Sequence, residues 1–141
     1  MSQTRHPAIT AASVLCFIHG VGWPIGLADP IIFMMRYRTL QVRSLPGMRE
    51  FRGLAGPFEV LGIDGIILLA LVFCAINVLF ILAGYWLWQS DRRGGILAFS
   101  LLAVSAVFWW GFGLPFPPVA GLLLAGLLAT GWKSLGKEVG P

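Results

Sequence analysis

The sequence predicts an all-α integral membrane protein built as a bundle of four transmembrane helices. Of its 141 residues, 57% are hydrophobic and only 11% are charged. A typical soluble domain carries about a quarter charged residues, and a soluble fold of this size has too little interior to bury so much apolar surface. We therefore expect a single membrane domain over residues 1–141.

Four apolar segments carry this prediction, at residues 8–27, 62–88, 95–114 and 118–135. A helix needs about 20 apolar residues to cross the hydrocarbon core, and the fourth segment only just meets that length. Their continuous apolar runs do not fit the strands of a membrane barrel, which alternate apolar and polar residues. If the first segment, which is interrupted by glycine and proline, re-enters the membrane instead of crossing it, the number of crossings falls to three.

The connection at residues 28–61 is long, and we expect it to form a cap that lies partly in the membrane interface. Asp29-Pro30 reads as a turn at its start. The short apolar piece at residues 31–35 is followed by basic and aromatic residues from Arg36 onward, a pattern typical of a segment lying in the interface. The other two connections are short and predict antiparallel neighbouring helices.

Basic residues flank the apolar segments and do not decide the orientation, because five fall on each side. With four crossings, one side holds Arg5, Arg92, Arg93, Lys133 and Lys137, and the other holds Arg36, Arg38, Arg43, Arg49 and Arg52. The long first loop, taken as an external cap, favours both termini in the cytoplasm. No aromatic residues alternate with a basic groove, so we expect the lipid bilayer of the cell membrane as the partner and no nucleic acid.

One group of residues is the candidate ligand pocket: His19, Glu59, Asp64, Trp109 and Trp110. An imidazole inside a membrane segment is costly unless it is paired, which makes it a functional candidate. The four-helix topology places all five residues at one membrane face, where two carboxylates, a histidine and an aromatic lining could hold a lipophilic molecule.

Each of these residues also has a purely structural interpretation. His19, near the predicted end of the first helix, could bond a freed carbonyl or interfacial water. Asp64 could stabilise the start of the second helix through the helix dipole. Trp109 and Trp110 could belong to the aromatic belt at the interface.

Asn77 is the clearest polar residue in the middle of a segment. An amide at that depth seeks a partner on a neighbouring helix, and Ser100 and Ser105 are the candidate partners. We expect a hydrogen bond between helices at this position, although a ligand contact is an alternative.

Small residues recur four apart on two segments, as in membrane helices that pack closely. They are Ala8, Ala12, Cys16 and Gly20 on the first and Gly121, Ala125 and Ala129 on the fourth. This spacing suits packing within the bundle, and it also suits contact with another subunit.

The sequence contains no phosphate loop, nucleophile elbow or zinc-protease motif, and its two cysteines do not form a metal-binding pattern. We therefore expect no metal, no cofactor and no enzymatic activity. The first functional hypothesis is an accessory subunit or oligomeric scaffold, which forms a homo-oligomer or binds a membrane-protein partner. The second is binding, carriage or transformation of a small lipophilic molecule, and the third is an oligomeric channel.

Overall fold

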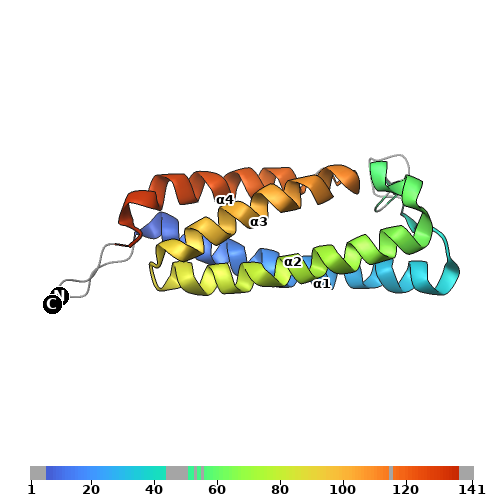
Figure 1. Ribbon diagram of the computed structural model, residues 1–141, viewed down its shortest axis with the longest axis horizontal. Coiled ribbons are helices and arrows are strands. Elements are labelled where there is room, and N and C mark those ends of the chain that lie inside the picture. The colour runs from blue at the N-terminus through green and yellow to red at the C-terminus, as the bar shows by residue number, and fades with distance from the viewer. Residues whose placement is uncertain (1–5, 44–50, 53, 55, 115, 137–141) are drawn as a thin grey trace.

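A computed structural model of the chain describes residues 6–43, 51–52, 54, 56–114 and 116–136. Four antiparallel helices form an elongated bundle in which α1 and α2 make one layer and α3 and α4 the other (Figure 1). Their bounds are α1 (Pro7–Tyr37), α2 (Gly62–Trp88), α3 (Arg92–Gly111) and α4 (Pro117–Gly131). The predicted all-α four-helix bundle is confirmed.

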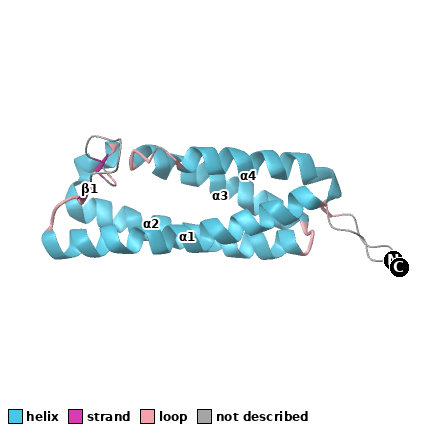
Figure 2. Cartoon of the chain, turned by 180° about the vertical axis from the view of Figure 1, so that it is seen from behind, coloured by secondary structure: helices cyan, strands magenta, loops and turns pink. Residues whose placement is uncertain are grey.

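The remaining elements are short and lie at the two ends of the bundle (Figure 2). Between α1 and α2, two-residue strands pair antiparallel, and a 3-10 helix leads into α2; a second 3-10 helix follows α4. They are β1 (Val42–Arg43), β2 (Phe51–Arg52), η1 (Pro57–Leu61) and η2 (Trp132–Ser134). Three of the basic residues that flank the apolar segments lie outside the described residues: Arg5, Arg49 and Lys137.

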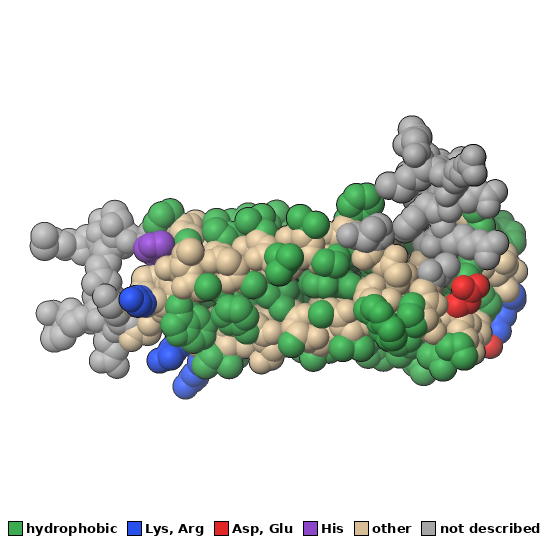
Figure 3. All heavy atoms as spheres, turned by 90° about the horizontal axis from the view of Figure 1, so that it is seen from above, with side chains coloured by type: hydrophobic (Ala, Val, Ile, Leu, Met, Phe, Trp, Pro, Cys, Tyr) green, Lys and Arg blue, Asp and Glu red, His purple; other side chains and the backbone are tan. Residues whose placement is uncertain are grey.

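Three helical stretches are long and apolar enough to cross a membrane: α1, η1 with α2 (Pro57–Trp88), and α3. In the most apolar part of each stretch, the buried share is only 33% for the first two stretches and 50% for α3. Apolar side chains cover the length of the molecule on the face seen in Figure 3, and charged ones gather at its two ends. The chain is therefore a multi-pass membrane protein. The fourth helix has 15 residues, which span about 22 Å against a hydrocarbon core of about 30 Å.

The first helix does not end near residue 27 as expected; it continues to Tyr37. Pro24 and Pro30 lie inside it, and the predicted turn at Asp29-Pro30 and the predicted interfacial piece at residues 31–35 are both helical. Proline is tolerated within membrane helices because neighbouring groups compensate the freed carbonyls. Its 31 residues span about 46 Å, so only the remainder of residues 28–61 is a loop.

Local sequence signals set the helix ends. The His6 side chain accepts a hydrogen bond from the Ala8 amide, and the Asp91 carboxylate accepts one from the Arg93 amide, so each caps a helix N-terminus. Arg38 ends α1 in the left-handed conformation, with φ at 56°, and its amide donates to Met34 O. Pro117 occupies the first position of α4, where proline lacks only an amide that has no helical partner.

The most extensive helix contact joins α1 to α2. A Cβ placed on Gly20 would lie 2.5 Å from Cγ1 of Ile81 and 3.0 Å from its backbone nitrogen. One on Gly84 would lie 3.1 Å from Cβ of Cys16. The buried Ser13 hydroxyl donates to Gly84 O at 2.7 Å, which adds a hydrogen bond between the two helices. Small residues therefore let the two backbones approach closely, as membrane helices require.

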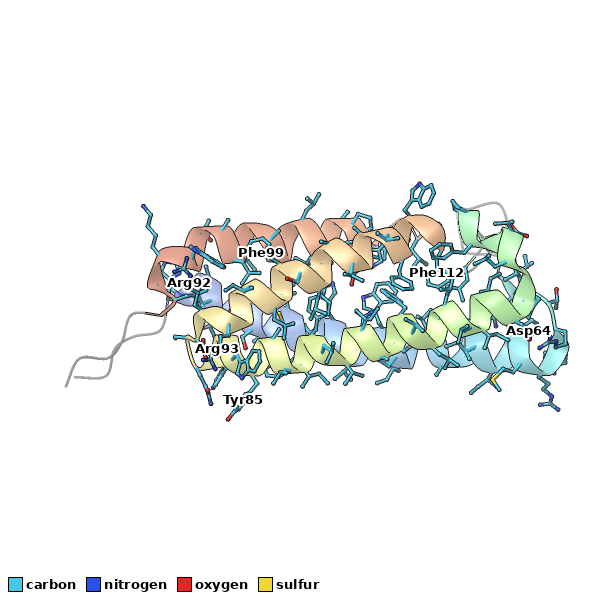
Figure 4. The ribbon with its side chains drawn as sticks, in the orientation of Figure 1. Asp64, Tyr85, Arg92, Arg93, Phe99 and Phe112 are labelled. Atoms are coloured by element: carbon cyan, nitrogen blue, oxygen red, sulfur yellow. The ribbon has the colours of Figure 1, made fainter. Side chains whose placement is uncertain are left out.

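Four phenylalanine rings pack together near the end of the bundle where α2 begins and α3 ends. Phe73 of α2 stacks on Phe108 of α3 at 5.2 Å between ring centroids, and Phe58 of η1 meets Phe112 edge-on at 5.3 Å. Figure 4 shows Phe112 between the two helix layers, and its side chain is fully buried. These rings hold η1 and the end of α3 against α2, with the geometry aromatic pairs prefer.

Gly20→Ala tests the close approach of α1 and α2. We expect it to destabilise the protein by about 1–3 kcal/mol, because the added methyl group meets backbone atoms that cannot move aside. Gly126→Ala is the matched control, since a Cβ on Gly126 would meet nothing within 4 Å. Thermal unfolding in detergent measures both variants, and equal midpoints for the two would contradict this packing.

Candidate functional site

His19 lies near the middle of the bundle, which differs from its expected place near the end of the first helix. It is 5% exposed, and its ring packs against Phe80 of α2 with centroids 5.5 Å apart. Its Nδ1 is 3.1 Å from Leu15 O, one turn earlier in α1. Its Nε2 is buried and has no hydrogen-bond partner among the described residues. The longer α1 explains the difference, because it moves the helix end far beyond His19.

A cavity of about 420 Å³ runs along the face of α1 that carries His19. The α1 residues that line it recur three or four apart, so they share one face of the helix. From His19 to Pro30 they extend over about 17 Å. Its lining consists of Ile18, His19, Gly22, Trp23, Gly26, Leu27 and Pro30 of α1, with Gln41, Leu54, Leu114 and Ala120 from the loops and α4.

Two glycines open this cavity towards the outside of the bundle. Gly22 and Gly26 are exposed, and a Cβ on either would meet nothing within 4 Å. Gly20 differs from them, because it lies on the face of α1 that contacts α2. The neighbouring Ile18 and Ile25 are 57% and 69% exposed, so the cavity borders the surface of α1 that faces lipid.

The polar side chains of the lining are few: His19 and Gln41 near its two ends, and between them Trp23, whose indole N–H is a donor. His19 is at the inner end, and Gln41 is at the end nearer the loop. The Gln41 amide donates to the Asp29 carboxylate at 3.3 Å. No carboxylate and no cationic side chain is part of the lining formed by the described residues. This arrangement suits an uncharged apolar molecule with one polar group.

Trp109 and Trp110 line a second hollow, of about 730 Å³, between α3 and α4. Trp109 is buried, its ring packs on Gly121 of α4, and its Nε1 has no partner among the described residues. Trp110 is 68% exposed, as in an aromatic belt. The two hollows share Leu114 in their linings.

Asp64 and Glu59 lie at the end of the bundle beyond the cavity (Figure 4, Asp64). The exposed Arg38 and Asp64 side chains form an ion pair at 2.5 Å. This hydrogen bond raises the pKa of the Arg38 guanidinium above its ordinary value. Glu59 and Arg38 border a separate shallow hollow at the start of α2.

The predicted pocket residues therefore do not form one site. His19 touches Phe80 of α2, sixteen positions after Asp64, which corresponds to about 24 Å along the helix. Trp109 and Trp110 line the other hollow. No group of three or more histidine, cysteine or acidic side chains could hold a metal ion among the described residues.

Asn77 is fully buried, but its described hydrogen bond stays within its own helix. Its Nδ2 donates to Phe73 O at 2.8 Å, and its Oδ1 has no described partner. Ser100 is exposed and donates to Ile96 O of its own helix. Ser105 is buried, and its hydroxyl has no described partner. Among the described residues, Ser13 makes a side-chain hydrogen bond between helices, which sequence reasoning missed.

Sequence reasoning also missed the residues that shape the cavity beside His19. A usable signal was present, because His19, Gly22, Gly26 and Pro30 follow one another at helical spacing. Glycine at such positions leaves room beside a helix.

The chain matches no protein family, no curated protein and no solved structure at a significant level.

Proposed function

We propose that this protein binds a small lipophilic molecule inside the membrane, in the cavity along α1. The observation that carries the proposal is the buried His19, which lines an apolar cavity with one ring nitrogen unpartnered among the described residues. Burying a polar atom without a hydrogen bond costs about 1–3 kcal/mol. A ligand that bonds this atom removes that cost.

The size and chemistry of the cavity support the proposal. Its volume of about 420 Å³ lies within the range of about 300–1,000 Å³ that is usual for small-molecule sites. Such sites are mainly apolar with a few placed polar groups, and this lining has the same character. Access from the bilayer through the Gly22–Gly26 face suits a molecule that is already dissolved in lipid.

The scaffold hypothesis has lost part of its motivation, because several of the small residues on which it rested have contacts inside the bundle, although Ala129 is exposed. Gly20 and Cys16 pack against α2, and Gly121 packs against Trp109. A homo-oligomer or membrane-protein partner stays a prediction, as do the oligomeric channel and the location in the cell membrane. We favour ligand binding because it accounts for the cavity as well as the bundle.

We further propose that α4 completes a fourth crossing beside α1 and α3. The end of α4 lies at the same end of the bundle as the start of α1, since a Cβ on Gly131 would lie 2.5 Å from Cδ1 of Ile9. The Gly136 amide donates to Ser90 O in the α2–α3 turn. The Arg92 guanidinium lies over the Trp132 ring, 5.2 Å from its centroid.

Accessibility of single cysteines to a membrane-impermeant maleimide tests this fourth crossing. Lys133→Cys and Arg92→Cys, each in a background with Cys16→Ala and Cys74→Ala, should react from one side of a sealed vesicle. Thr39→Cys in the same background should react from the other side. Reaction of Lys133→Cys and Thr39→Cys from the same side would show that α4 does not cross.

A larger side chain in place of Gly22 tests the proposed function, because it would occupy part of the cavity. The probe is hexadecanol with a photoactivatable diazirine in its chain, added to the protein in phosphatidylcholine vesicles. We expect saturable labelling of the α1 peptide that contains Trp23 and Leu27. Gly22→Leu should weaken the apparent affinity about tenfold, which corresponds to about 1.4 kcal/mol, because the new side chain occupies the cavity.

Gly126→Leu is the matched control, since it adds the same side chain to an exposed helical glycine outside the cavity. It should leave labelling of the α1 peptide unchanged. Labelling that does not saturate, or that is equal in the two variants, would refute binding in the cavity.

A further inference from the structure

The hydrogen bond made by His19 within α1 defines what its other ring nitrogen can do. Nδ1 lies 3.1 Å from Leu15 O. A backbone carbonyl only accepts hydrogen bonds, so Nδ1 must carry the proton and donate it. In a neutral imidazole the second nitrogen is then unprotonated and acts as an acceptor. The ring nitrogen that has no partner among the described residues, Nε2, is therefore an acceptor.

The surroundings of His19 favour this neutral ring. The lining contains no carboxylate among the described residues, and the nearest aromatic partner is the apolar Phe80. A charged imidazolium without a counter-charge is costly inside the membrane. The same cost disfavours a charged group on the ligand, since the lining has no cationic side chain to balance an anion.

We infer that the ligand is an uncharged lipophilic alcohol, whose hydroxyl donates a hydrogen bond to Nε2 of His19. This inference rests on the proposed function and adds the chemistry of the ligand to it. A hydroxyl supplies the donor that the acceptor nitrogen requires and carries no charge. A ketone or ether of the same shape offers only acceptors and would leave Nε2 without a partner.

The shape of the cavity adds that the alcohol is elongated. His19 lies at its inner end, near the middle of the bundle, and Pro30 and Gln41 lie at the other end. This face of α1 extends over about 17 Å, and between its ends the lining is mainly apolar, with Trp23 and the open glycine face. The hydroxyl binds at mid-membrane depth, and the apolar chain lies along α1 towards the loop.

A hydrogen bond elsewhere in the chain suggests a substitution that tests the role of His19 Nε2 as the acceptor. Asn77 donates from Nδ2 to the carbonyl of Phe73 four residues earlier, at 2.8 Å. His19 bonds Leu15 O with the same spacing. His19→Asn can therefore preserve the hydrogen bond to Leu15 O, but it replaces Nε2, on the far side of the ring, by an Oδ1 bonded directly to Cγ, which is withdrawn from the position that the hydroxyl would reach. Because the ring contact with Phe80 is lost, this variant should unfold at a lower temperature than the unaltered protein, and its folding is checked before its binding is compared.

The experiment is competition against the photoactivatable hexadecanol in phosphatidylcholine vesicles, with hexadecanol and hexadecyl methyl ether as unlabelled competitors. In the unaltered protein, hexadecanol should compete about 5- to 10-fold better than the ether, the effect of one neutral hydrogen bond. In His19→Asn, hexadecanol should weaken to the level of the ether, and the ether should be unaffected.

The outcomes separate this inference from the proposed function. Equal competition by alcohol and ether in the unaltered protein, with Gly22→Leu still weakening labelling, would overturn the alcohol and keep the lipophilic site. Labelling that neither competitor reduces would overturn both. Should His19→Asn be unstable, the ratio of alcohol to ether in the unaltered protein decides by itself.

Discussion

The close contact of α1 with α2 determines the rest of this structure. Gly20 and Gly84 bring the two backbones together, and the Ser13 hydroxyl bonds across them. With one face of α1 committed to α2, the adjacent face carries the open glycines Gly22 and Gly26. The cavity exists because packing stops between these two faces, and His19 lies where they meet, against Phe80 and in the cavity lining.

The fold was largely predictable because continuous apolar runs determine membrane helices. The second helix occupies residues 62–88, as predicted, since a long apolar run, interrupted by the amide of Asn77, extends between a polar start at Asp64 and a polar turn after Trp88. The first helix was predicted about ten residues too short. In water, proline usually ends or kinks a helix, because it removes a backbone hydrogen bond. Within this membrane bundle, α1 continues through both Pro24 and Pro30.

This error in length explains most of what was missed in the site. A helix ending near residue 27 places His19 at the interface beside Asp64, whereas the observed helix places it deep in the bundle. Asp64 instead pairs with Arg38, which is the residue that ends the longer helix. His19 could be singled out as a candidate from its chemistry alone, but its neighbours depended on where the helix ends.

The two tryptophans illustrate a different limit. Trp109 and Trp110 are adjacent in sequence, and successive residues of a helix point about 100° apart. One is buried on Gly121 and the other is exposed. Because α3 is apolar on every side, its sequence pattern does not reveal which face meets α4 and which meets lipid.

Nitrogen NMR of the protein with ¹⁵N-labelled imidazole rings tests the central claim most directly. His6 and His19 are the two histidines, and His6→Gln assigns their signals. We expect that His19 carries its proton on Nδ1, and that the Nε2 resonance shifts when hexadecanol is added but not when hexadecyl methyl ether is added. A proton on Nε2, or a resonance that hexadecanol leaves unmoved, would contradict a ligand site at His19.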